Sequence, residues 1–188
     1  QGEASSTFEP PPPITSLTEG LRVLTRSIQT ETETPQGCAV ARDPPAPNTS
    51  QTIFIGCATT QNGDGENMAG ASLWYGPENE KNMVLRVPVD QLQTSRSADI
   101  CATLLAIQRA PRDQALKIVS SKNSSRIAMT RNLGTLEDKG WVGVANRDSL
   151  KALAAELRSR TAATIFVDVS PESPEILRNG ERTARLQA

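Results

Sequence analysis

The order of strand-like and helix-like segments constrains the fold of this chain more than any other feature. Three strand patterns come first, at about 52–62, 69–76 and 83–88, with turn signals between them. After Pro88, segments with helical spacing of apolar residues alternate with short apolar runs. Helices are expected at 95–109, 122–131, 147–160 and from Ser173-Pro174 to about Leu186, and strands at 116–119 and 163–169. This β-β-β-α-β-α-α-β-α order predicts an α/β fold with a mixed sheet flanked by helices.

The composition excludes several kinds of function. The 188 residues include no histidine, so Ser-His-Asp and Cys-His catalysis and histidine-based zinc sites are ruled out. The formal charge is −1 and aromatic residues make up 3% of the chain, so we expect neither a broad basic surface nor base-stacking platforms. Cys38, Cys57 and Cys101 lack the short spacings of a zinc site, and their odd number argues against a disulfide framework.

Two parts of the chain differ in character. Within the N-terminal arm and linker, 1–50, residues 1–13 contain a proline run at 10–13 and are expected to be extended polyproline or disordered. An apolar segment at 16–28 is expected to dock as a short helix or strand, and residues 29–50 form a Thr-, Glu-, Pro- and Asn-rich linker. Residues 51–188 are expected to form the folded domain. No apolar run is long enough to span a membrane, and reduced cysteines favour an intracellular protein.

Five segments together are similar to a known family. They are TIFIGCATTQNG (52–63), AGASLWYGP (69–77), QTSRSADICATLLAIQRAP (93–111), LKIVSSKN (116–123) and LEDKGWVGVAN (136–146). They resemble ribonuclease H type-1 domains, and most closely those attached to fungal retroelement reverse transcriptases. The resemblance implies the ribonuclease H-like fold, a five-stranded mixed sheet whose first strand is central and whose first three strands are antiparallel. It also implies cleavage of RNA in RNA–DNA hybrids, with four carboxylates that hold two divalent metals.

Only one of the four positions that match those carboxylates is acidic here. Gly56 matches the aspartate that contacts both metals, and Asp99 matches the glutamate of the first helix. Ser121 matches the third acid, and Ala184 matches the fourth, or Arg182 does if a short gap is placed differently. The resemblance therefore implies a degenerate active site with no intact metal site.

Neighbouring residues reinforce this interpretation. Lys122 follows Ser121, and its positive charge would oppose the binding of a metal cation. Glu172 stands where the family has a loop histidine that assists product release. We expect no cofactor. Mg²⁺ or Mn²⁺ would enter only if other acids, such as Asp64, Glu66 or Asp168, rebuilt a metal site, whereas a solvated turn or strand edge is their simpler role.

The positions that would contact a hybrid are also altered. Asn62 matches an asparagine that contacts an RNA 2′-hydroxyl, whereas Ser95 and Arg96 replace Asn or Gln residues with a similar task. Cys57 and Cys101 are expected near the former site, and their simpler role is that of small buried apolar residues.

These observations favour a catalytically inactive, retroelement-derived domain that acts by binding a protein partner or, weakly, RNA or DNA. Two alternatives remain open. One is an active metal-dependent RNA–DNA hybrid ribonuclease with a rebuilt metal site. The other is a decayed fragment of an element, without a selected role.

Overall fold

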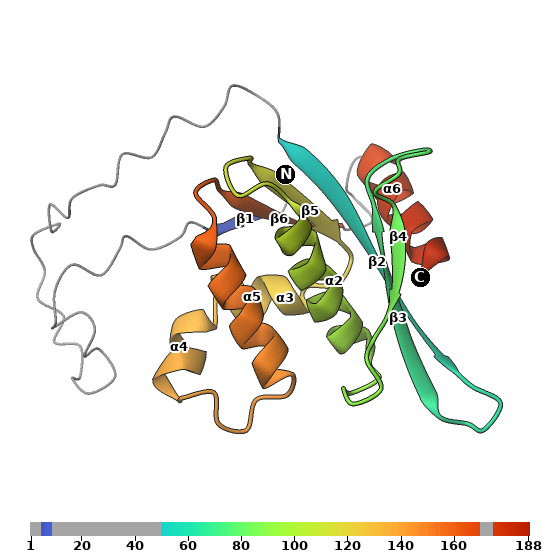
Figure 1. The fold of residues 1–188 in the computed structure, drawn as a ribbon, viewed down its shortest axis with the longest axis horizontal. Coiled ribbons are helices and arrows are strands. Elements are labelled where there is room, and N and C mark those ends of the chain that lie inside the picture. Colours follow the sequence, from blue (N-terminus) through green and yellow to red (C-terminus); the bar gives the residue numbers. More distant parts are fainter. Residues whose placement is uncertain (1–4, 9–49, 170–174) are drawn as a thin grey trace, which may run out of the picture.

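The computed structural model describes residues 5–8, 50–169 and 175–188 (Figure 1). A six-stranded sheet runs through the domain in the order β1-β6-β5-β2-β3-β4. The strands are β1 Ser5–Phe8, β2 Gln51–Gln61, β3 Asn67–Trp74, β4 Met83–Arg86, β5 Leu116–Ser120 and β6 Thr164–Asp168. β2, β3 and β4 pair in antiparallel fashion, whereas β5 lies parallel to both β2 and β6. The mixed sheet expected from the sequence is confirmed, with β2 inside it.

β1 is a sixth strand that the sequence analysis did not expect. Residues 1–13 were interpreted as polyproline or disorder, but Ser5–Phe8 pairs antiparallel with β6, from Ser5 opposite Val167 to Phe8 opposite Thr164. The Phe8 side chain is buried in the main core. The four residues precede the proline run, so each can donate its N–H to a neighbouring strand. The rest of the expected arm and linker, 9–49, lies outside the described residues.

Five helices are described, and all but one were expected. They are α2 Ser95–Arg109, α3 Ser124–Thr130, α4 Leu133–Asp138, α5 Arg147–Ser159 and α6 Glu175–Gln187. α4 was not expected: it has six residues and contains Gly134, and only Leu133 and Leu136 pack partly against the core, which is too short an apolar pattern to predict a helix. Among the described residues, no helix has the length and apolar character that crossing a membrane requires.

The helices cover the sheet from both sides (Figure 1). Because side chains alternate along a strand, Ile53, Ile55 and Cys57 of β2 face one side, and they join the large core formed with α2 and α5. Phe54 faces the other side, where it forms a small cluster with Val119, Val167 and Ala184 of α6. Gly56 has the same parity as Phe54. The residue that matches the metal-bridging aspartate is therefore on the α6 face.

α2 has well-defined ends that place its first turn beside β2 and β3. The Thr94 hydroxyl accepts a hydrogen bond from the Ser97 N–H (3.1 Å) and so caps the helix. The Ser97 hydroxyl in turn donates to Asn146 Oδ1 (3.1 Å) in the loop before α5. Ala110, in an extended conformation, and then Pro111 end the helix.

Candidate functional site

The space that a side chain at Gly56 would need is filled by the backbone of α6. A Cβ atom on Gly56 would lie 2.2 Å from both the Ala184 carbonyl carbon and the Arg185 nitrogen. Real Cβ contacts are almost never below 3.0 Å, and helix backbone cannot yield as a flexible side chain would. Ala184, which matches the fourth acid, is fully buried at this contact. Neither position can present a side chain to solvent.

Small residues on three elements allow this close approach. Ser72 is paired with Gly56 in the sheet, and its hydroxyl donates a hydrogen bond to the Ala184 carbonyl oxygen. A Cβ on Gly70 would lie 2.7 Å from the Ala188 carbonyl oxygen, and one on Gly180 would lie 2.4 Å from the Phe54 ring. The absence of a side chain at Gly56 is therefore part of how α6 is docked.

Ser72→Ala should loosen this docking. The variant keeps the small volume but leaves the buried Ala184 carbonyl without its side-chain donor, so we expect a loss of about 1 kcal/mol in the free energy of unfolding. Urea unfolding measures the loss, and hydrogen exchange should become faster in α6. Ser50→Ala, at an exposed position, should change stability by less than about 0.5 kcal/mol. Unchanged exchange in α6 would contradict the anchoring role.

Asp99, the one retained carboxylate, is buried and holds α3 in place. Its Oδ2 accepts hydrogen bonds from the Ser125 N–H and hydroxyl, both at 2.9 Å, and its Oδ1 accepts a longer one from the Ser120 hydroxyl (3.4 Å). Asn123, which precedes α3, makes no side-chain cap, so Asp99 of α2 supplies the cap. The Asp99 side chain therefore has a structural role, which is to cap α3.

The surroundings of Asp99 favour its neutral form. Burial raises the pKa of this carboxyl from 3.8 to about 6, although the hydrogen bonds from Ser125 and Ser120 and the charge of Lys122 act in the opposite direction. Asp99 faces a narrow cavity that also contains Ser120 and Asp168 and that does not include Gly56. Since Asp99 and Gly56 lie on opposite sides of the sheet, they do not share one open site.

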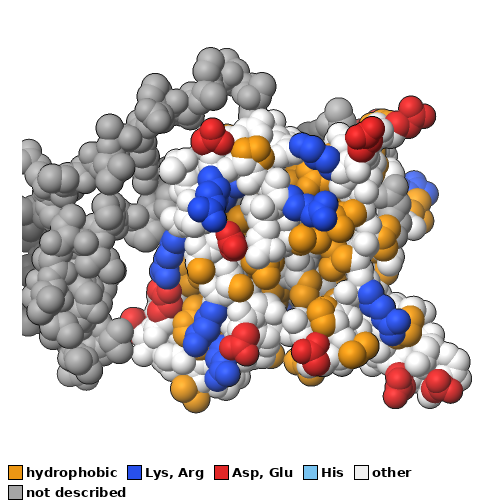
Figure 2. All heavy atoms as spheres, in the orientation of Figure 1, with side chains coloured by type: hydrophobic (Ala, Val, Ile, Leu, Met, Phe, Trp, Pro, Cys, Tyr) orange, Lys and Arg blue, Asp and Glu red, His pale blue; other side chains and the backbone are white. Residues whose placement is uncertain are grey.

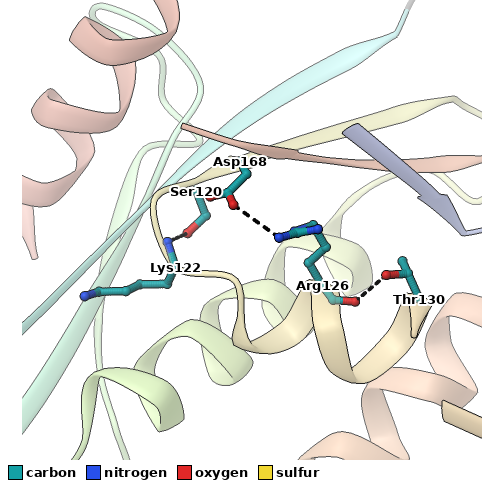
Figure 3. Close-up of polar contacts among 5 residues, drawn as sticks. All are labelled: Ser120, Lys122, Arg126, Thr130 and Asp168. Atoms are coloured by element: carbon teal, nitrogen blue, oxygen red, sulfur yellow. Dashed lines mark hydrogen bonds and ion pairs between the residues drawn. The ribbon is translucent and has the colours of Figure 1, made fainter. Parts of the chain in front are cut away.

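Asp168 has a cationic partner in the same region (Figure 3). It ends β6 opposite Ser120, and its Oδ2 lies 3.2 Å from Arg126 Nη2. Ser120 also accepts a hydrogen bond from the Lys122 N–H (3.0 Å), while the Lys122 side chain extends away from the Arg126–Asp168 pair. Ser121, the match to the third acid, is exposed beside them.

The remaining candidate ligands do not gather with Asp99. Asp64 and Glu66 lie in the exposed turn between β2 and β3. Glu172 lies outside the described residues. Within 5–8, 50–169 and 175–188, no group of three or more His, Cys, Asp or Glu side chains could hold a metal ion.

Of the three expected hybrid-contacting residues, Asn62 lies in the turn after β2, and Ser95 and Arg96 begin α2. Asn62 organises its own turn: its Oδ1 accepts from the N–H groups of Asp64 (3.0 Å) and Glu66 (2.8 Å). Ser95 begins α2 and lines a large cavity, whereas Arg96 is exposed and does not line it. Ser95 is therefore the one of the three that belongs to the cavity.

That cavity has a volume of about 480 Å³ and lies over the end of β2. Its cationic side chains are Lys122, Arg182 and Arg185, and none of the acidic side chains that the structure describes lines it. Sequence reasoning identified Lys122 as an obstacle to a metal site and Arg182 as an alternative match to the fourth acid, and it overlooked Arg185. The available signal was the three-residue spacing of Arg182 and Arg185, which places both on one side of a helix.

Cys57 and Cys101 have different surroundings. Cys57 is buried in β2, where it joins the main core and lines the large cavity. Cys101 is half-buried in α2, and its thiol donates to Gln91 Oε1 (3.3 Å). Burial raises the pKa of the Cys101 thiol, so its reactive thiolate form is disfavoured. Cys38 lies outside the described residues.

Solved structures share this fold, although no family model and no curated protein matches the chain. A foamy viral protease–reverse transcriptase in complex with dsDNA matches at 15% identity and a TM-score of 0.58, over 73% of this chain and 90% of that one. The PFV RNase H domain matches at 15% identity and 0.52, with the same coverage. LC9-RNase H1, a type 1 RNase H with the type 2 active-site motif, matches at 14% identity and 0.52, over 75% and 72%.

The chain has the ribonuclease H-like fold. The similar structures are ribonuclease H domains or contain the fold within a reverse transcriptase, at low sequence identity. In one longer structure, that of the Prototype Foamy Virus protease–reverse transcriptase, this chain spans only 21% of the length. The fold therefore limits the functional question to what such a domain does with these site residues.

Proposed function

We propose that this chain is a catalytically inactive ribonuclease H-like domain, derived from a retroelement, that acts by binding a partner. The observation that carries the proposal is the contact at Gly56, where the backbone at Ala184 and Arg185 leaves no room even for a Cβ atom. A two-metal nuclease needs a carboxylate that contacts both cations, because those cations position the attacking and leaving oxygens. Here helix backbone occupies the place of that side chain.

The other residues at the matching positions do not fit two divalent metals either. Mg²⁺ requires oxygen ligands in near-octahedral geometry. Asp99 already accepts hydrogen bonds from Ser120 and Ser125, and Ala184 has no oxygen in its side chain. Lys122 adds a positive charge next to Ser121, which holds the third position. We therefore assign no catalytic step to a metal.

Nucleic acid is the partner that the described residues favour over protein. The cavity over the end of β2 carries three cationic side chains, and such groups bind phosphates. A foamy viral protein that shares the fold is described in complex with dsDNA. A protein partner stays as an outcome of the tests, since the net charge of −1 is unusual for a strong nucleic-acid binder.

Cleavage assays test the absence of catalysis directly. A labelled RNA–DNA hybrid is incubated with the full chain in Mg²⁺ and, separately, in Mn²⁺, and the same is done with Asp99→Asn. We expect no metal-dependent product from either protein above the background of a mock preparation. Cleavage by the parent that is lost in Asp99→Asn would overturn the proposal and establish an active hybrid ribonuclease.

A further inference from the structure

The large cavity has the composition of an anion site. It lies between the end of β2, the first turn of α2, the loop after β5 and the last turns of α6. Lys122, Arg182 and Arg185 bring ammonium and guanidinium groups from two of these elements. Thr59 and Ser95 add hydroxyl groups that can donate hydrogen bonds. All five side chains offer donors to a ligand.

The described protein balances the charges of this cavity only in part, through the electrostatic interaction of Lys122 with Asp99. None of its three cationic side chains takes part in the ion pairs found among the described residues, which involve Arg126, Arg147 and Arg158. Like charges around one cavity repel one another, and a bound anion removes that repulsion. Ser95 is the first residue of α2, so the positive end of that helix dipole adds to the field, and its first turn contains no acidic residue.

We propose that this cavity binds a backbone phosphate of a nucleic acid directly, through Lys122, Arg182 and Arg185. The inference rests on the proposed binding function and specifies its ligand. Guanidinium groups bind phosphate oxygens in bidentate fashion, and the lysine contributes a point charge. No divalent cation is required, because the protein supplies the positive charge itself.

The number of cations at the cavity limits how many phosphates are held. Figure 2 shows Lys and Arg side chains interspersed with Asp and Glu over the displayed face, without one continuous basic area. Three cations support roughly one to three phosphate contacts, so log K should fall with log[salt] with a slope of about −1 to −3 on duplex DNA. No aromatic side chain lines the cavity, so binding should depend little on base sequence.

Fluorescence anisotropy of the full chain tests this with matched variants. Labelled 12-residue probes of RNA–DNA hybrid, duplex DNA and single-stranded DNA are titrated in EDTA across a salt series. We expect binding without divalent metal at low salt. Lys122→Gln/Arg182→Gln/Arg185→Gln should weaken it about tenfold or more and flatten the salt dependence.

The control variant removes the same charge elsewhere. Arg131→Gln/Lys139→Gln/Lys151→Gln changes three exposed cations outside the cavity, and we expect less than about a twofold change in affinity. Circular dichroism verifies that both triple variants are folded. Equal losses in the two variants would overturn the site, because net charge alone would then explain the binding.

Further measurements distinguish a nucleic-acid phosphate from other phosphate ligands. They also test the phosphate site separately from the absence of catalysis. Inorganic phosphate competing at concentrations as low as those of the oligonucleotide would show a small-anion site and refute the backbone ligand. Binding of a phosphopeptide but of none of the oligonucleotides, or no binding of any probe at low salt, would also refute it. These results leave the absence of catalysis intact, whereas metal-dependent cleavage overturns that proposal independently.

Discussion

Gly56→Asp should destabilise the protein by about 4 kcal/mol or more instead of restoring a nuclease. The new Cβ would meet the backbone of Ala184 and Arg185 at 2.2 Å, so α6 must move away from the sheet. Overpacking alone costs about 1–3 kcal/mol, and burying a carboxylate without partners adds to it. Urea unfolding measures the loss, and hydrogen exchange should show that α6 becomes unprotected.

A matched substitution separates this effect from the chemistry of aspartate. Gly63 lies in the turn after β2, and a Cβ atom added there would have nothing within 4 Å, so Gly63→Asp should change stability by about 0.5 kcal/mol or less. The loss of stability in Gly56→Ala should lie between those of Gly56→Asp and Gly63→Asp. If Gly56→Asp unfolded at the same urea concentration as the parent and kept α6 protected, the steric account of this position would be wrong.

The stability contributed by Asp99 should fall as the pH rises from about 4 to about 7. Its pKa is about 6 in the folded protein and 3.8 ordinarily, so within this range the folded state binds more protons than the unfolded one. Stability then decreases with rising pH, and the contribution is complete below pH 4 and lost above the folded pKa. The difference between the two pKa values corresponds to about 3 kcal/mol.

Asp99→Asn isolates this contribution from those of other carboxylates. The amide keeps the size of the side chain and can still accept hydrogen bonds, but it does not ionise. The free energy of unfolding of the parent minus that of the variant should fall by about 3 kcal/mol between pH 4 and pH 8. Asp64→Asn, in the exposed turn, serves as the control. A difference that stays constant with pH would rule out a buried, titrating Asp99.

The order of the main strands and helices could be predicted from the sequence because the local spacing of apolar residues indicates each element. β2 to β6 and the helices α2, α3, α5 and α6 were expected at nearly the observed bounds. β1 was missed because its partner, β6, is more than 150 residues away in the sequence, and a four-residue segment beside prolines carries little local signal. Pairing over such a separation is decided by tertiary structure.

The candidate site was harder to predict because its residues act across long separations. Gly56 could be recognised as a missing acid, but its packing role depends on where α6 docks. Asp99 looked like a surviving ligand, yet its partners are Ser120 and Ser125, which belong to other elements. The role of Arg185 could not be predicted, because it depends on the docking of α6, which places Arg185 and Lys122 at the same cavity.

α6 links the packing of the sheet to the formation of the cationic cavity. Its buried side, at Gly180 and Ala184, covers Phe54 and Gly56, while its exposed side presents Arg182 and Arg185 to the cavity. The cavity thus exists in full only while the helix is docked. By mass action, any ligand that needs both arginines stabilises the docked form by RT ln(1 + [L]/Kd). A loosened helix lowers the affinity for that ligand through the same coupling.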